Sequence, residues 1–153
     1  MNAIELLKED HDRVSSLFEK VKANEGGDNT DVFAQIKAEL EVHTHIEETI
    51  FYPRLLEEGD EELQKIVKEG IEEHRQAKMF LRELEGLADD SEKFEPKITV
   101  LMEDVEHHVQ EEEGEMFQLV ESQFDEDVLE AMGAEMEEEK ANFKPQSSSA
   151  GAR

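Results

Sequence analysis

Residues 40–53 read LEVHTHIEETIFYP, and the pattern within this stretch decides the fold. Apolar and polar side chains share the three- and four-residue spacing of a single helical stripe, at Leu40, His43, Glu47, Ile50 and Phe51. A histidine and a carboxylate on a buried stripe are costly unless a partner satisfies them. His43 and Glu47 lie one helical turn apart and point at the same spot, but two ligands do not saturate a metal ion. Matching ligands must therefore come from other stretches of the chain.

The composition is strongly acidic. The 153 residues include 42 of Asp and Glu against 16 of Lys and Arg, which gives a net charge of −26. Such a surface repels phosphate backbones and anionic lipid, so we expect no nucleic-acid partner and no membrane partner. The N-terminal residues carry acids, and no run approaches the roughly 20 apolar residues of a membrane span, which predicts a cytoplasmic protein. The chain contains no cysteine, which excludes disulfides and thiolate chemistry.

Helical periodicity extends over almost the whole chain. Amphipathic stripes predict four long helices and a shorter fifth one, at about 2–22, 31–57, 60–88, 91–122 and 126–140. The predicted fold is all-α, an antiparallel up-down-up-down four-helix bundle with a short fifth C-terminal helix. We expect this domain to cover residues 1–141 and residues 142–153 to form a disordered tail. Pro53 is expected to kink the second helix, and Gly70 indicates close packing on the third.

The chain is weakly repeated. In each half, a helix with one central histidine is followed by a helix with the pattern His-x-x-x-Glu. The central residues of antiparallel helices lie at a similar depth, so their polar side chains can converge on one point of the core. The predicted metal ligands are His11, His43, Glu47, His74, His108 and Glu112.

Two further histidines are expected to lie off these stripes. His45 lies about 200° round its helix from the buried stripe, and His107 lies about 100° off the stripe that contains His108. His107 with Glu111 is the alternative ligand pair on the fourth helix. The other glutamates of residues 111–113 are expected to be solvated.

A single buried histidine would be explained most simply as a satisfied core residue. Four imidazoles and two carboxylates without a cation would leave several buried polar groups unpaired, at about 1–3 kcal/mol each, against a net stability of about 5–15 kcal/mol. The sequence therefore predicts a metal centre. Imidazole and carboxylate without thiolate suit iron, manganese or zinc, and the two carboxylates are well placed to bridge two cations.

The motifs resemble those of the hemerythrin-like, or HHE cation-binding, family over about residues 1–122. The resemblance is carried by Asp10-His11, VHTHIEETIFYP at 42–53, Glu73-His74 and HVQEE at 108–112. It implies a non-haem di-iron centre with an oxo or hydroxo bridge. In that centre Glu47 and Glu112 would bridge the two irons, and the histidines would be terminal ligands.

The third helix departs from the pattern of the oxygen-carrying members of that family, which have a second histidine four residues after the first. Here His74 is followed four residues later by Lys78. One terminal ligand is thus absent, or replaced by a glutamate or by water. The resemblance then points to sensors and stress-linked iron proteins rather than to carriers.

Three functions compete for this sequence. We favour a di-iron protein that binds oxygen, nitric oxide or iron itself, for sensing, iron storage or the handling of oxidative or nitrosative stress. The alternative is an enzyme that activates oxygen or peroxide, although no further polar constellation indicates a substrate pocket. The third is a metal-free acidic helical protein with a basic partner, but such a scaffold needs no polar groups in its core. The sequence identifies no protein partner.

Overall fold

The computed structural model describes residues 1–87 and 91–144, and every regular element in these ranges is helical. The elements are α1 (Ala3–Ala23), α2 (Thr30–Ile46), η1 (Glu47–Phe51), α3 (Tyr52–Glu58), α4 (Glu61–Glu85), α5 (Phe94–Glu111), η2 (Glu112–Met116), α6 (Phe117–Gln123) and α7 (Glu126–Asn142), where η marks a π-helical turn. The predicted end of the third helix at residue 88 and most of the predicted tail, residues 145–153, lie outside the described residues.

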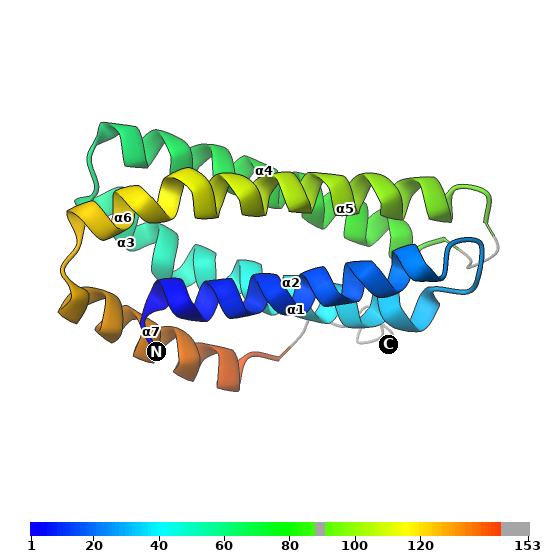
Figure 1. The fold of residues 1–153 in the computed structure, drawn as a ribbon, viewed down its shortest axis with the longest axis horizontal. Helices are drawn as coiled ribbons and strands as arrows, with labels where there is room; N and C mark the ends of the chain where they lie inside the picture. The colour runs from blue at the N-terminus through cyan, green and yellow to red at the C-terminus, as the bar shows by residue number, and fades with distance from the viewer. Residues whose placement is uncertain (88–90, 145–153) are drawn as a thin grey trace.

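Four long rods form the bundle. They are α1, the continuous run α2–η1–α3, α4, and the continuous run α5–η2–α6. Figure 1 shows these rods lying lengthwise beside one another, with α7 along the outside of the bundle next to α1. The predicted all-α bundle with a fifth helix is confirmed.

The helix starts follow from local capping. Asn2 accepts a hydrogen bond from the backbone N–H of Glu5, whose side chain accepts one from the backbone N–H of Asn2, so a capping box begins α1. Asp60 caps α4 by accepting from the backbone N–H of Leu63. These caps fix where the first and third rods begin, and hence the depth of the histidines within them.

Two π-helical turns interrupt the second and fourth rods, and each begins at the glutamate of a His-x-x-x-Glu pattern. Such turns are rare and often occur at functional sites. Pro53 lies two residues after the first π-helical turn, in the first turn of α3, whereas no proline lies in or next to the second π-helical turn. Proline is therefore not the common cause, and the shared feature of the two turns is the glutamate.

The hydrophobic core consists of two clusters of buried residues. One surrounds Leu7, Phe51, Leu63 and Phe117, and the other surrounds Phe18, Ile36, Leu84 and Leu101. Along each of the four rods, buried polar side chains separate the residues of one cluster from those of the other. The rods thus bury a polar layer where an ordinary bundle would have a continuous apolar core.

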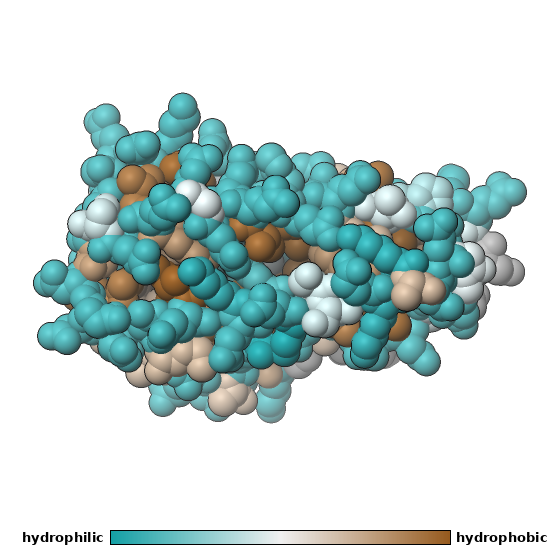
Figure 2. Space-filling model, viewed as in Figure 1, coloured by the Kyte–Doolittle hydropathy of each residue, from teal (hydrophilic) through white to brown (hydrophobic). Residues whose placement is uncertain are grey.

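The surface is mostly hydrophilic. Figure 2 shows hydrophobic residues mainly in recesses between polar ones on the face that it presents. No helix among the described residues combines the length and the apolar character that crossing a membrane requires.

Candidate metal centre

The six predicted ligands come together in the core as two groups of four. The first ligand group is His11, His43, Glu47 and Glu112, and the second ligand group is Glu47, His74, His108 and Glu112. Within each group one possible ligand atom from every residue lies within 4.8 Å of the others, and every member is buried. Because both groups contain the same two carboxylates, the arrangement has the form of a paired cation site.

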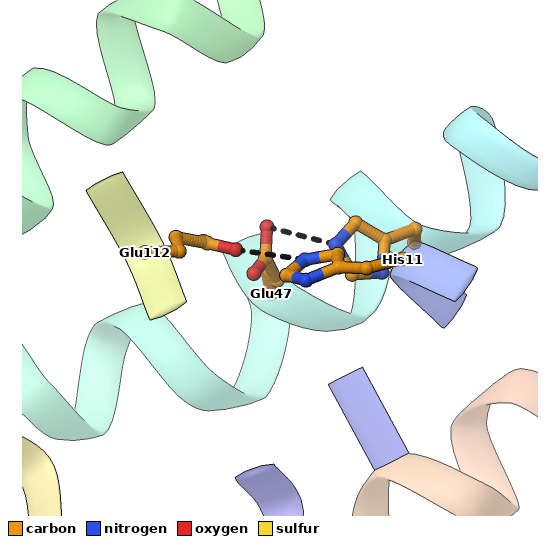
Figure 3. Close-up of side chains that lie close together, drawn as sticks. His11, Glu47 and Glu112 are labelled. Carbon is orange, nitrogen blue, oxygen red and sulfur yellow. Dashed lines mark hydrogen bonds and ion pairs between the residues drawn. The ribbon is translucent and has the colours of Figure 1, made fainter. Parts of the chain in front are cut away.

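The first ligand group is built by three of the rods. His11 Nε2 of α1 lies 3.0 Å from Glu112 Oε1 at the start of η2. His43 Nε2 of α2 lies 3.5 Å from Glu47 Oε1 at the start of η1. Figure 3 shows the side chains of His11, Glu47 and Glu112 pointing toward one another.

The second ligand group repeats this geometry on the other pair of imidazoles. His74 Nε2 of α4 lies 2.8 Å from Glu47 Oε1, and His108 Nε2 of α5 lies 3.3 Å from Glu112 Oε2. The rings of His74 and His108 are 4.9 Å apart between centroids. Each shared glutamate thus faces one imidazole of each group.

Several of these buried atoms have no hydrogen-bond partner. Neither oxygen of Glu47 has one, nor does Nε2 of His43, although His74 Nε2 is within ion-pair distance of Glu47. A carboxylate with no exposed surface and no hydrogen bond is strongly disfavoured unless a cation compensates it. Buried nitrogen and oxygen atoms without hydrogen bonds are suited to act as metal ligands, and this set fits two cations held by imidazole and carboxylate.

The other ring nitrogen of each histidine contacts a second carboxylate. The four contacts from Nδ1 are 2.6 Å to Glu113 for His11, 2.9 Å to Asp10 for His43, 2.7 Å to Glu48 for His74 and 2.5 Å to Glu73 for His108. A carboxylate only accepts, so each Nδ1 donates, and this orients Nε2 toward the ligand groups. We call Asp10, Glu48, Glu73 and Glu113 the outer carboxylates.

The outer carboxylates form a ring around the bundle. Each one is the sequence neighbour of a ligand on its own rod but contacts the histidine of the next rod. The outer carboxylate of α1 contacts the histidine of α2, that of η1 the histidine of α4, that of α4 the histidine of α5, and that of η2 the histidine of α1. In the sequence, the outer carboxylates are marked only by being acidic residues next to predicted ligands. Glu113 is partly exposed, but its contact with His11 was not predicted, because a contact with another rod cannot be read from one helix.

Tyr52 is a further residue that the sequence analysis missed. Its hydroxyl donates a hydrogen bond to Glu112 and lies 3.4 Å from His74 Nε2 and 3.5 Å from His108 Nε2. Burial and the neighbouring glutamate charges raise the pKa of Tyr52 well above its usual value, so the phenol keeps its proton. Gly70 makes room for it, since a Cβ there would lie 3.1 Å from the Tyr52 hydroxyl oxygen.

Regular α-helical spacing explains the omission of Tyr52. The predicted stripe continued from Ile50 and Phe51 directly to the next turn. Where the π-helical turn ends, Phe51 and the next residue, Tyr52, are both buried while Ile50 is half-buried. The turn therefore directs two consecutive large side chains inward, and one of them reaches the second ligand group.

Lys78 does not enter the ligand groups. Its side chain is partly exposed, and its Nζ donates to Glu48 Oε1 at 2.7 Å, while Glu48 Oε2 accepts from His74. Burial raises the pKa of Glu48, but these two partners outweigh burial and lower it to about 2. At the position where oxygen-carrying members of the family have a second histidine, this chain thus has a lysine that contacts an outer carboxylate.

The remaining two histidines belong to neither ligand group. His45 contacts Glu139 of α7 at 2.7 Å, and His107 is exposed and lies 3.4 Å from Glu111. Glu73, His107 and Glu111 come close together at the surface, where acidic groups are common without an ion. The structure thus brings His108, rather than His107, into the buried cluster.

The electrostatics of the centre favour positive charge. Burial lowers the pKa of His43, but the charge of Glu47 and the hydrogen bond to Asp10 outweigh burial and raise the pKa to about 10. For Glu112, burial raises the pKa, but the charge of His108 and the hydrogen bonds from neighbouring side chains together outweigh burial and hold the pKa well below its usual value. The two shared glutamates and the outer carboxylates outnumber the nearby cations, which are Arg13, Lys78 and Lys140. The protein groups alone thus attract protons or metal cations.

A small cavity adjoins the ligand groups. Its volume is about 130 Å³, and it touches all four imidazoles. Its apolar walls include Val14, Leu40, Ala77 and Val105. Ligand pockets for drug-sized molecules usually measure about 300–1,000 Å³, so this cavity suits a molecule of only a few atoms.

Comparisons with known proteins agree with this geometry. The family model of the hemerythrin HHE cation-binding domain matches residues 2–120. The crystal structure of a hemerythrin HHE cation-binding domain-containing protein from Mycobacterium kansasii is similar with a TM-score of 0.75 and 27% identity, covering 92% of this chain and 88% of that one. A DNA nickase from Nostoc sp. is 24% identical over 148 residues, which are 94% of this chain. The match spans 40% of that relative's length.

Proposed function

This chain belongs to the hemerythrin HHE cation-binding domain family, and from that premise we propose that it is a non-haem di-iron protein. The two ligand groups would hold one iron each, with Glu47 and Glu112 shared and the four histidines terminal. The observation that carries the proposal is that two buried groups of four donors share two carboxylates. Carboxylate-rich four-helix bundles hold paired metal ions in this way. Manganese or zinc suits the same donors, and metal analysis separates the three.

We infer that the small ligand of this centre is oxygen, nitric oxide or a molecule of similar size. Bound irons supply redox chemistry and exchangeable coordination positions. The cavity beside the imidazoles admits a molecule of a few atoms, and most of its lining surface is apolar. The outer carboxylates keep the imidazoles in one orientation, and Tyr52 holds a proton beside the second ligand group. These features suit a role in sensing, iron storage or the handling of oxidative or nitrosative stress.

A second candidate is an enzyme that activates oxygen or peroxide, and Tyr52 favours it. A protonated phenol that already donates to Glu112 can supply a hydrogen bond to a group bound within the site. The activity named for the Nostoc relative is not carried over. The chain matches less than half of that protein, and its net charge of −26 opposes binding to a phosphate backbone.

Metal analysis of the purified protein tests the proposal. We expect close to two irons per chain, and we expect the double variant His43→Ala with His108→Ala to lose them, because each ligand group loses one imidazole. His45→Ala is the matched control, since this histidine contacts α7 instead of the ligand groups. Undiminished iron in the double variant would reject the ligand set.

An absorption spectrum separates reversible ligand binding from one-way oxidation of the centre, and a Tyr52 variant then tests the enzyme candidate. The reduced, iron-loaded protein is exposed to oxygen and then returned to low oxygen. A charge-transfer band that appears and disappears reversibly indicates ligand binding, whereas one-way oxidation indicates a sensor, a store or an oxidase. Tyr52→Phe should retain the iron and change this response in the enzyme case, because only the hydroxyl is removed.

A further inference from the structure

The last turn of α7 is tied to the segment that carries the first ligand group. Lys140 Nζ donates a hydrogen bond to Asp10 Oδ1, and Glu139 contacts the ring of His45, which lies between two ligands in sequence. The ring of Phe143 packs on the same histidine, with 4.8 Å between centroids. The end of α7 therefore reaches both α1 and α2 beside the metal centre.

Asp10 links Lys140 to a ligand. Its side chain is buried, and its two oxygens have different partners. Oδ1 accepts from Arg13 and Lys140, while Oδ2 accepts from His43 Nδ1 at 2.9 Å. The two cations thus hold the carboxylate in the orientation in which Oδ2 faces the imidazole. Lys140 is the only one of these partners that comes from outside α1 and α2.

The middle of α7 is docked by close backbone packing. A Cβ at Gly133 would lie 2.3 Å from the carbonyl oxygen of Met1 and 2.9 Å from the backbone nitrogen of Ala3. Leu129, Met132 and Met136 are buried in the hydrophobic cluster that also contains residues of α1. The body of α7 thus holds Lys140 over Asp10 without any contribution from the metal centre.

We propose that Lys140 is a positioning residue for the first ligand group, so that docking of α7 and cation binding at His43 are coupled. The contacts Lys140–Asp10 and Asp10–His43 carry the coupling. With α7 docked, the carboxylate is fixed and Nε2 of His43 faces Glu47. With α7 displaced, Asp10 loses one of its two cations and holds the imidazole less firmly. The inference rests on the proposed function of the centre.

Coupling of this kind is reciprocal. If docking of α7 strengthens cation binding by some factor, cation binding strengthens docking of α7 by the same factor. Occupancy of the first ligand group is thereby transmitted to the outer surface of the molecule, at the C-terminal end of α7. A merely structural ion pair between Lys140 and Asp10 would show no such dependence on the cation.

Cobalt(II) titration of the full chain, followed by its visible absorption, tests the first half of the coupling. We expect two binding steps in the wild type. Lys140→Met should weaken one step by up to about tenfold and leave the other unchanged. Lys140 acts through Asp10, and loss of the outer partner of a metal ligand itself costs about 10–100-fold in affinity. Lys140→Arg should restore the wild-type titration. Lys144→Met is the matched control, because it removes the same charge from an exposed lysine four residues further on.

Hydrogen exchange of α7, with and without cobalt, tests the reciprocal half. In the wild type the amides of α7 should become more protected when cobalt binds, and in Lys140→Met this gain should shrink by the same factor as the affinity. Circular dichroism should show that the variant remains folded. Asp10→Asn should produce the same affinity loss, and the double variant should add little to it, because both residues act through one path.

The outcomes separate the two proposals. If the wild type binds neither cobalt nor iron, the proposed function fails and this inference with it. If the wild type binds two cations and Lys140→Met binds them with unchanged affinity, only the coupling is refuted. Hydrogen-exchange protection of α7 that is the same with and without cobalt would refute the coupling as well.

Discussion

Among single residues, Glu47 has the most demanding environment. It has no exposed surface, neither of its oxygens has a hydrogen-bond partner, and it belongs to both ligand groups. A neutral side chain of the same size would avoid the cost of burying this charge. The stability of the bundle alone does not explain this glutamate, whereas the proposed cation binding does.

His43 predicts how the stability of the cation-free protein depends on pH. Its pKa is raised from 6.5 to about 10 in the folded chain, so the protonated form favours folding. This contribution is complete below pH 6.5 and is lost as pH rises through about 10, at up to about 1.4 kcal/mol per pH unit. Urea unfolding of chelator-treated protein between these pH values should show a falling free energy of unfolding. His43→Gln should flatten the profile, and an unchanged profile in that variant contradicts the assignment.

At the scale of elements, each rod supplies a ligand and orients the ligand of the next rod. The outer carboxylates make these contacts, and lysines of α4 and α7 stabilise two of the four. The two π-helical turns add a second effect, because each directs two consecutive large side chains inward, Phe51 with Tyr52 and Met116 with Phe117. The ring of Phe117 consequently lies parallel to that of His11, with 6.0 Å between centroids.

Lys78→Met tests the ring of outer carboxylates on α4. The change removes the partner that holds Glu48 against His74, so cation affinity at the second ligand group should fall several-fold, at most about tenfold, while the first group keeps its affinity. Arg75→Met is the control, because Arg75 is exposed and pairs only at 3.5 Å with Glu72 on the same helix. Equal cobalt titrations for the two variants would show that Lys78 has no positioning role.

At the scale of the whole molecule, a cation site connects four rods that carry a large like charge. The net charge of −26 opposes compaction, and the surplus of carboxylates around the centre adds to this repulsion. Two bound cations would neutralise the centre and tie together side chains that are distant in sequence. Metal binding should therefore contribute much of the stability of the bundle.

Thermal unfolding with and without iron measures this contribution. At a free iron concentration about 100 times the dissociation constant, a site present only in the folded state adds about 2.7 kcal/mol to stability, so the melting temperature should rise and chelation should reverse the rise. Glu47→Gln should abolish the increase, because that side chain belongs to both ligand groups. A chelated wild type that melts at the same temperature as the loaded protein would contradict this role of the metal.

Helical periodicity and the His-x-x-x-Glu spacing were enough to predict the all-α bundle and to select the six candidate ligands, because both are properties of single helices. Only the tertiary structure revealed the contacts of the outer carboxylates, the link from Lys140 to Asp10, and the place of Tyr52 beside the second group. The first two depend on how one rod is rotated against its neighbour. The third depends on a π-helical turn that breaks the regular 100° step on which the sequence prediction relied.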